Sequence, residues 1–287
     1  MKRTALPVSI ETFIKNIKSS FEKSPEIISK LLKDADIKES ELNQWTNFDH
    51  PKNEGYGRSL IYKDSQFEIM VMSWAPNDAT AIHNHGYTNW GAVQVFGTLE
   101  HTVFEKQENF LVTSYREKLN DKEIITVDGD LIHQMANHSD ENALSIHVYG
   151  TSENAPGITD DALIYDVGEH ELLQVSGGAF YDLPASEKTV VSSAIYADRL
   201  TEIAHYASLL RHYLKTGYRG PHYRKSVNYF QDRSFESRLI TELEMDSKGV
   251  LYWVELNKVK ILLKKLNESS RIIDSILLDI NDFDRYS

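Results

Sequence analysis

The chain has 287 residues, of which 41% are hydrophobic, enough to fill one large core or two ordinary ones. Acidic residues outnumber basic ones by 43 to 31, which disfavours nucleic acid and anionic membranes as partners. The chain has no cysteine, so disulfides, thiolate metal sites and a cysteine nucleophile are excluded, and a metal must be held by nitrogen or oxygen. Charges interrupt every apolar run in residues 1–23, which fits neither a secretory signal nor a membrane span and predicts a cytoplasmic protein.

The first predicted elements are helices between residues 8 and 44. Apolar residues recur there at helical spacing, and Ser24 followed by Pro25 is typical of a helix cap and its first turn. We predict two or three helices in this part of the chain.

Residues 58–175 have a different texture, with short β-rich runs separated by Gly, Asn and Asp. Such a density of short strands predicts an antiparallel barrel or sandwich. No internal repeat that would indicate a solenoid or a propeller is visible.

Helical spacing returns in the last third of the chain, over residues 192–215 and again over 250–280. Between them, the aromatic and basic stretch 217–230 begins with Gly and Pro residues and is predicted to be a loop. We place a boundary near residue 185, between a β-rich domain with N-terminal helices (1–185) and a helical C-terminal region (186–287) of unknown role.

Two histidines, His83 and His85, stand two residues apart in the stretch IHNHG. On a strand, residues i and i+2 point to the same face, so both ring nitrogens can reach one ion. The spacing alone is a weak signal, because two polar strand residues would produce it as well. A metal needs at least a third ligand.

A second patterned stretch, GDLIHQMANHSDENALSIHVYG, begins at Gly129. It contains His133, with Asn137 four residues later, and then a strand with polar residues at alternate positions. Two further histidines, His101 and His138, are interpreted as a surface or core residue and as a solvated turn residue.

Together with Gly97, these two stretches resemble the halves of the cupin signature, in which two hairpins of a small barrel bring their histidines together. The resemblance implies a mainly β fold, a small antiparallel β-barrel (jelly roll) with N-terminal helices and an α-helical C-terminal region. It makes His133 the third ligand. The carboxylate that cupins usually carry after the histidine pair is missing, because GYTNWGAV stands there. Compared with two histidines and a carboxylate, three neutral imidazoles give a ferrous site one more positive charge, which a thiolate substrate would balance.

The region from Tyr56 to about Tyr181 resembles the cysteine dioxygenase family of cupin thiol dioxygenases. Four motifs carry the resemblance: YGR at 56–58, IHNHG at 82–86, LIHQMANHS at 131–139 and SIHVY at 145–149. It implies an Fe(II)-dependent enzyme that uses O2 to convert cysteine, or a close amino-acid thiol, to the sulfinic acid. The compact members lack residues 186–287, whose helices are candidates for a lid, a homo-oligomer contact or a separate domain.

The resemblance also assigns roles to residues. It gives Fe(II) three ligands, namely His83, His85 and His133. Arg58 corresponds to the clamp for the substrate carboxylate, a task that suits the planar, permanently charged guanidinium; its alternative is a surface arginine. Tyr56 would be a lesser pocket residue or ordinary packing.

Ser145, His147 and Tyr149 would form a hydrogen-bonded relay on one face of a strand, with Tyr149 donating to bound oxygen or to the substrate carboxylate. The alternative is three buried polar residues that satisfy one another. Trp74 and Trp90 are assigned to the core or the pocket wall. The cross-link between a cysteine and the relay tyrosine, found in many animal members, cannot form in a chain without cysteine.

Three functions stay open at this point. The leading one is a thiol dioxygenase acting on cysteine or a close analogue. The second is a related biosynthetic oxygenase that oxidises a different thiol or cleaves a bond. The third is a non-catalytic cupin sensor in which the histidines hold Zn(II) or Ni(II).

Overall fold

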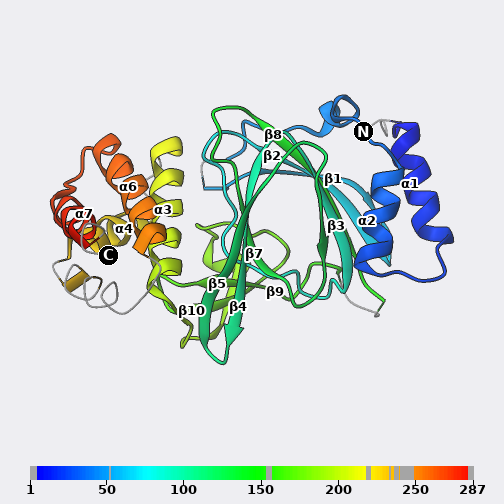
Figure 1. Cartoon of the computed structure of the whole chain (residues 1–287). Helices are drawn as coiled ribbons and strands as arrows, with labels where there is room; N and C mark the ends of the chain where they lie inside the picture. The colour runs from blue at the N-terminus through cyan, green and yellow to red at the C-terminus, as the bar shows by residue number, and fades with distance from the viewer. Residues whose placement is uncertain are drawn as a thin grey trace.

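The structure is a computed structural model that describes residues 5–51, 53–152, 157–217, 221–232, 234–235, 239 and 249–283. Two facing walls of β-strands form its centre (Figure 1), with the N-terminal helices at one end and the C-terminal helices at the other. Within the described residues, no helix combines the length and apolar character that a membrane crossing requires.

The N-terminal part forms helices, as the sequence predicts. They are α1 (Val8–Ser19), α2 (Pro25–Asp34) and the 3-10 helix η1 (Glu39–Trp45). Ser24 caps α2 by accepting a hydrogen bond from the backbone N–H of Ile27, and Pro25 occupies the first turn, where its missing N–H costs nothing. The buried faces of α1 and α2 pack with the outward-facing residues of the first sheet in one apolar cluster.

The first sheet has the strand order β1-β2-β8-β3-β6, and all its neighbouring pairs are antiparallel. Its strands are β1 (Gly57–Lys63), β2 (Phe67–Trp74), β8 (Ala143–Gly150), β3 (Trp90–Phe96) and β6 (Ile124–Val127). In β2, Ile69 and Val71 pack against the helices, whereas Met70 and Met72 face the interior of the barrel. The alternation follows from the pleat of a strand, and both faces are apolar because both are covered.

The opposite wall is built from two smaller sheets, ordered β12-β5-β4-β7 and β11-β10-β9. Their strands are β4 (Leu99–Gln107), β5 (Phe110–Leu119), β7 (Ile132–Ala136), β9 (Ala162–Asp166), β10 (Glu171–Val175), β11 (Lys188–Ser192) and β12 (Tyr196–Ala197), and a short 3-10 helix, η2 (Ala185–Glu187), precedes β11. Isolated bridges from His83 to His133 and to Ile164 place residues 82–84 between β7 and β9 and so join the two sheets. The result is the predicted mainly β, jelly-roll barrel.

The C-terminal region is helical, with α3 (Arg199–Thr216), α4 (Pro221–Gln231), α6 (Gly249–Lys265) and α7 (Arg271–Phe283). The predicted loop over 217–230 is wrong for its described part from 221 onward, which is α4; residues 218–220 lie outside the described residues. Buried Tyr223, Val227 and Phe230 are spaced one and two turns apart, so tertiary packing selects a helix here. The stretch predicted over 250–280 is broken into two helices by residues 266–270.

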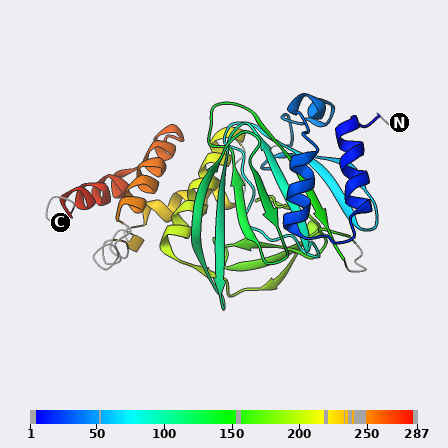
Figure 2. The same ribbon diagram turned by 45° about the vertical axis from the view of Figure 1, so that its right-hand side comes forward.

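Helix α3 lies between the barrel and the remaining C-terminal helices (Figure 2). Leu210 and Tyr213 of α3 share an apolar cluster with Ala81 and Ile164 of the barrel. The Lys215 ammonium forms an ion pair with the fully buried Asp78, which precedes the histidine pair. The C-terminal helices begin only at residue 199, because the residues after 185 first form β11, which pairs with β10, and β12, which pairs with β5. The domain division at residue 185 stays a prediction.

Candidate metal centre and pocket

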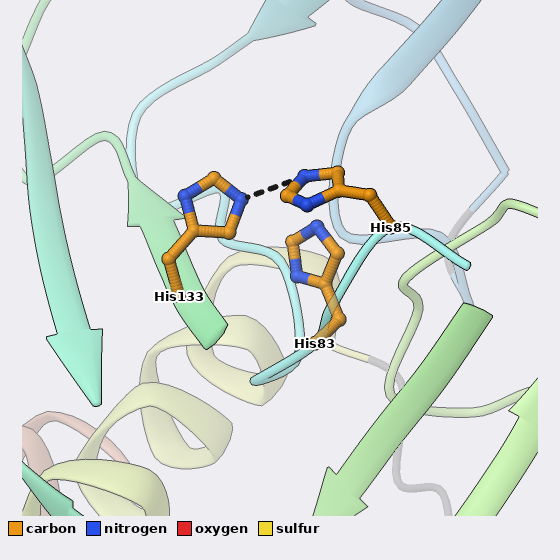
Figure 3. A group of neighbouring side chains, drawn as sticks. All are labelled: His83, His85 and His133. Carbon is orange, nitrogen blue, oxygen red and sulfur yellow. Dashed lines mark hydrogen bonds between the residues drawn. The ribbon is translucent and has the colours of Figure 1, made fainter. Parts of the chain in front are cut away.

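Three histidines converge at the junction between the two smaller sheets. His83 and His133 are opposite each other and exchange two backbone hydrogen bonds, of 3.0 and 2.9 Å, so their side chains leave the backbone on the same side. His85 follows two residues later and places its Nε2 3.1 Å from Nε2 of His133 (Figure 3). One ring nitrogen from each residue lies within 4.8 Å of the others, and among the described residues this is the one group of three or more His, Asp or Glu side chains placed so that it could hold a metal ion.

The chemistry of these rings fits a metal ion. Two nitrogens that each bind one ion at about 2.1 Å and at right angles lie about 3.0 Å apart, close to the separation of the two Nε2 atoms. The Nδ1 atom of His83 lies 2.9 Å from the carbonyl oxygen of Ala81, so it donates there and leaves Nε2 as the free lone pair. Burial lowers the pKa of His83 to about 4 and also lowers the pKa values of His85 and His133 well below their usual range, which favours the neutral form that metals bind.

The turn after His85 depends on glycine. Gly86 has φ +58°, and a Cβ at this position would lie 2.0 Å from the carbonyl oxygen of Asp160. A side chain is excluded there both by the left-handed backbone and by the close approach of the facing loop. The glycine thus permits the turn that follows the histidine pair and leads to β3.

Strand β8 brings Ser145, His147 and Tyr149 to the inner face of the first sheet, in hydrogen-bonded sequence. Ser145 Oγ is 2.7 Å from His147 Nε2, and His147 Nδ1 is 2.6 Å from the Tyr149 hydroxyl. Trp74 donates to Ser145 Oγ over 2.8 Å and extends the series. Burial, then the nearby His83 and Arg58, lowers the pKa of His147 to about 3, and burial also raises the pKa of Tyr149.

The histidines and the Tyr149 hydroxyl face one pocket of 470 Å³, a volume that includes its open mouth. Tyr56 and Trp74 line the pocket with their rings stacked at a centroid distance of 5.0 Å, and the Tyr56 hydroxyl accepts a hydrogen bond from the backbone N–H of Ala179. Trp90 is fully buried in the cluster beneath the N-terminal helices. Of the two tryptophans, Trp74 is pocket wall and Trp90 is core.

Arg58 lies in an adjoining open groove of 860 Å³, a volume that includes open solvent, rather than among the residues that line the histidine pocket. Thr159 lines both spaces and marks where they meet. The Arg58 Nη2 atom is 3.8 Å from the carboxylate of Glu68, a buried residue that also accepts a hydrogen bond from Thr159 at 3.0 Å. Gly177 keeps this junction open, since it has φ +81° and its Cβ would lie 2.5 Å from Thr159 Oγ1.

Residues missed by sequence reasoning surround the predicted ones. His101, predicted to be a surface or a core residue, lies in the core; the sequence did not indicate its contacts, with Nε2 3.0 Å from Nδ1 of His133 and Nδ1 2.9 Å from Glu117. Glu68 belongs to none of the sequence motifs. His138, expected to be solvated, is partly buried with its side chain 22% exposed and its Nδ1 3.4 Å from Glu100, so that expectation is wrong.

Comparison with solved structures finds distant likenesses. A protein from Thermus thermophilus is 16% identical with a TM-score of 0.32, over 40% of this chain and 96% of its own. An oxalate oxidase is 14% identical with a TM-score of 0.35, over 45% of this chain and 63% of its own. An uncharacterised protein with a double-stranded β-helix domain from Klebsiella pneumoniae is 15% identical with a TM-score of 0.31, over 40% of this chain and 90% of its own.

A protein-family model gives a broader match. The model described as cysteine dioxygenase type I matches residues 3–153, which is more than half of the chain. The matched span contains the three converging histidines and the whole relay from Ser145 to Tyr149. The chain therefore belongs to the cysteine dioxygenase type I family.

Proposed function

We propose that this protein is an iron-dependent thiol dioxygenase that converts cysteine, or a close amino-acid thiol, to the sulfinic acid. The observation that carries the proposal is the ligand set itself: three neutral imidazoles with no carboxylate ligand among the described residues. Two histidines and a carboxylate are the common set for non-haem Fe(II) oxygenases. A set without the carboxylate favours a substrate that brings its own negative charge, and a thiolate does so.

Fe(II) held by His83, His85 and His133 would bring thiolate and O2 together and pass electron density to O2, so that both oxygen atoms end on sulfur. The protein's own residues would orient the substrate and hold the hydroxyl proton of Tyr149 toward it. Since Trp74 can only donate to Ser145, the direction Ser145 to His147 to Tyr149 satisfies each group and leaves the Tyr149 hydrogen facing the pocket. Tyr149 is thereby a donor toward the substrate, and its raised pKa keeps it protonated.

Tyr149→Phe is expected to lower kcat by about 10- to 100-fold, because a hydrogen bond to a charged group contributes about 1.5–3 kcal/mol. The metal content should stay at the wild-type level, since the hydroxyl is no ligand in this proposal. Oxygen-uptake kinetics and metal analysis on the same samples measure both. Tyr165→Phe, which removes the hydroxyl of a buried tyrosine that does not line the pocket, is the matched control; wild-type kcat in Tyr149→Phe would contradict the role of the relay.

Arg58→Ala is expected to raise the KM for cysteine by about 10- to 100-fold, because it removes a charge-assisted contact to the substrate carboxylate. Iron binding should be unaffected. The charge of Arg58 reaches the pocket, where it acts on His147 and Tyr149. Lys63→Ala, which removes the other cation beside Glu68 in the same groove, should change the KM much less. Equal effects of the two substitutions would mean that general attraction, and not a clamp, recruits the substrate.

Oxygen uptake by iron-loaded protein with L-cysteine, cysteamine and 3-mercaptopropionate side by side tests the proposal. Cysteine should be oxidised fastest, because it alone offers both the carboxylate and the amine. Protein that holds zinc or nickel and consumes no oxygen with any thiol would favour the sensor function. The cytoplasmic location stays a prediction.

A larger thiol is a second candidate substrate, and the groove favours it. Arg58 and Lys63 both line the open groove beside the pocket, and each forms an ion pair with the Glu68 carboxylate. A γ-glutamyl-cysteine peptide, which has two carboxylates, would offer one to each cation. The peptide therefore belongs in the substrate panel, with homocysteine, which has a single carboxylate, as the comparison; a higher kcat/KM for the peptide than for cysteine would support this candidate.

A further inference from the structure

The outer nitrogens of the three candidate ligands differ in their surroundings. The Nδ1 atom of His83 faces the neutral carbonyl of Ala81, and the Nδ1 atom of His85 has no hydrogen-bond partner among the described residues. The Nδ1 atom of His133 instead lies 3.0 Å from Nε2 of His101, whose Nδ1 is 2.9 Å from the Glu117 carboxylate. Of the three ligands, His133 is therefore the one connected to a charged group.

The direction of these two hydrogen bonds follows from what each group can do. A carboxylate accepts, so Nδ1 of His101 must donate to Glu117. A neutral imidazole with its hydrogen on Nδ1 has a lone pair on Nε2, so Nδ1 of His133 must donate to His101. The lone pair of His133 is then on Nε2, the atom that faces the other two histidines in Figure 3.

We infer that Glu117 and His101 are positioning residues that fix the tautomer of His133 and lend negative charge to the metal site through two hydrogen bonds. This inference rests on the proposed metal centre and concerns how the chain tunes it. The ligand set has no carboxylate, and Glu117 provides one outside it. The His101 side chain is 2% exposed and that of Glu117 is 43% exposed, so the series runs from the site to the protein surface.

The physical consequence is a stronger ligand. A histidine whose outer N–H donates toward a carboxylate is a more basic ligand, and such outer partners are typically worth about 10- to 100-fold in metal affinity. Since His101 stands between Glu117 and His133, the effect of removing the carboxylate should lie near the lower end of that range.

Glu117→Gln tests the charge, because it keeps the shape and an oxygen that can accept from His101. Its dissociation constant for Co(II) or Zn(II), measured by competition with a chelator, is expected to rise about tenfold. Glu105→Gln is the matched control, since Glu105 lies in the same β4–β5 hairpin, is exposed, and bonds to Ser114 and not to a histidine. Metal affinities of Glu117→Gln and Glu105→Gln that both equal the wild-type value would overturn the inference.

The tautomer gives a readout that needs no metal. Long-range ¹H–¹⁵N NMR of the metal-free protein should show His133 and His101 each protonated at Nδ1, and Glu117→Leu should remove this preference in His101. Protonation of His133 at Nε2 in the wild type would overturn the inference. Wild-type protein that binds no divalent metal would instead contradict the metal centre, so the two failures are distinguishable.

Discussion

His133→Ala is expected to abolish stoichiometric metal binding and, with it, oxygen uptake. Two ligands would remain, and both belong to the same short segment, so nothing would hold an ion from the opposite side. Removal of a mere outer partner costs about 10- to 100-fold in affinity, and loss of a direct ligand should cost more than about 100-fold. Metal content after dialysis, and the dissociation constant for Co(II), would measure the loss.

The control for this substitution is His138→Ala, five residues later in the same chain segment. His138 contacts Glu100 and not the site, so its removal should leave metal binding unchanged. Thermal unfolding of both metal-free variants would show whether the fold is kept. A His133→Ala protein that still retains one metal ion per chain would rule out His133 as a ligand and, with it, the three-histidine centre.

The candidate site was predictable from sequence wherever it depends on local geometry. Ser145, His147 and Tyr149 must share a face on any regular strand, because successive side chains alternate, and the structure joins them by hydrogen bonds of 2.7 and 2.6 Å. The strand expected for the histidine pair is absent: His83 makes only isolated bridges and His85 follows in a loop, so the alternation rule does not by itself explain why the two rings converge. His133 required the motif order as well, because only the fold brings it opposite His83.

The hydrogen-bonded connection from His133 through His101 to Glu117 depends on strand register, which is difficult to predict from the sequence. At the tip of the β4–β5 hairpin, Gln107 pairs with Phe110, and counting back from there would place His101 opposite Arg116. A bulge between Val103 and Phe104 shifts the register by one residue, so that Glu117 stands opposite His101 instead. One inserted residue thus decides whether a cation or a carboxylate faces the histidine.

The helical region shows the same limit in another form. Residues 221–230 are rich in aromatic and basic side chains and lie beside Gly and Pro, so local signals favour a loop. The helix α4 forms because Val227 and Phe230 join an apolar cluster to which α3 and α6 also contribute. A partner that lies far away in sequence can override local propensity.

Removal of residues 186–287 is expected to prevent folding of the remaining chain, although the sequence suggests a boundary at 185. The cut would strip β11 from β10 and remove α3, whose Ile203 and Leu210 are fully buried. It would also leave Asp78 buried without the Lys215 ammonium. A fully buried Leu or Ile contributes about 1.5–3 kcal/mol, and several of them together are comparable with the whole stability of a domain, about 5–15 kcal/mol.

Two point substitutions in the full-length chain test how much the packing of α3 contributes to stability. They avoid the risk that a truncated chain fails to fold. Leu210→Ala, at a fully buried position of α3, should lower the free energy of unfolding by about 2–5 kcal/mol. Ile261→Ala, whose side chain on α6 is 55% exposed, should change it by no more than about 0.5 kcal/mol. Denaturant titration followed by circular dichroism measures both. If instead the chain of residues 1–185 folds and binds metal like the wild type, the barrel does not need α3 to fold.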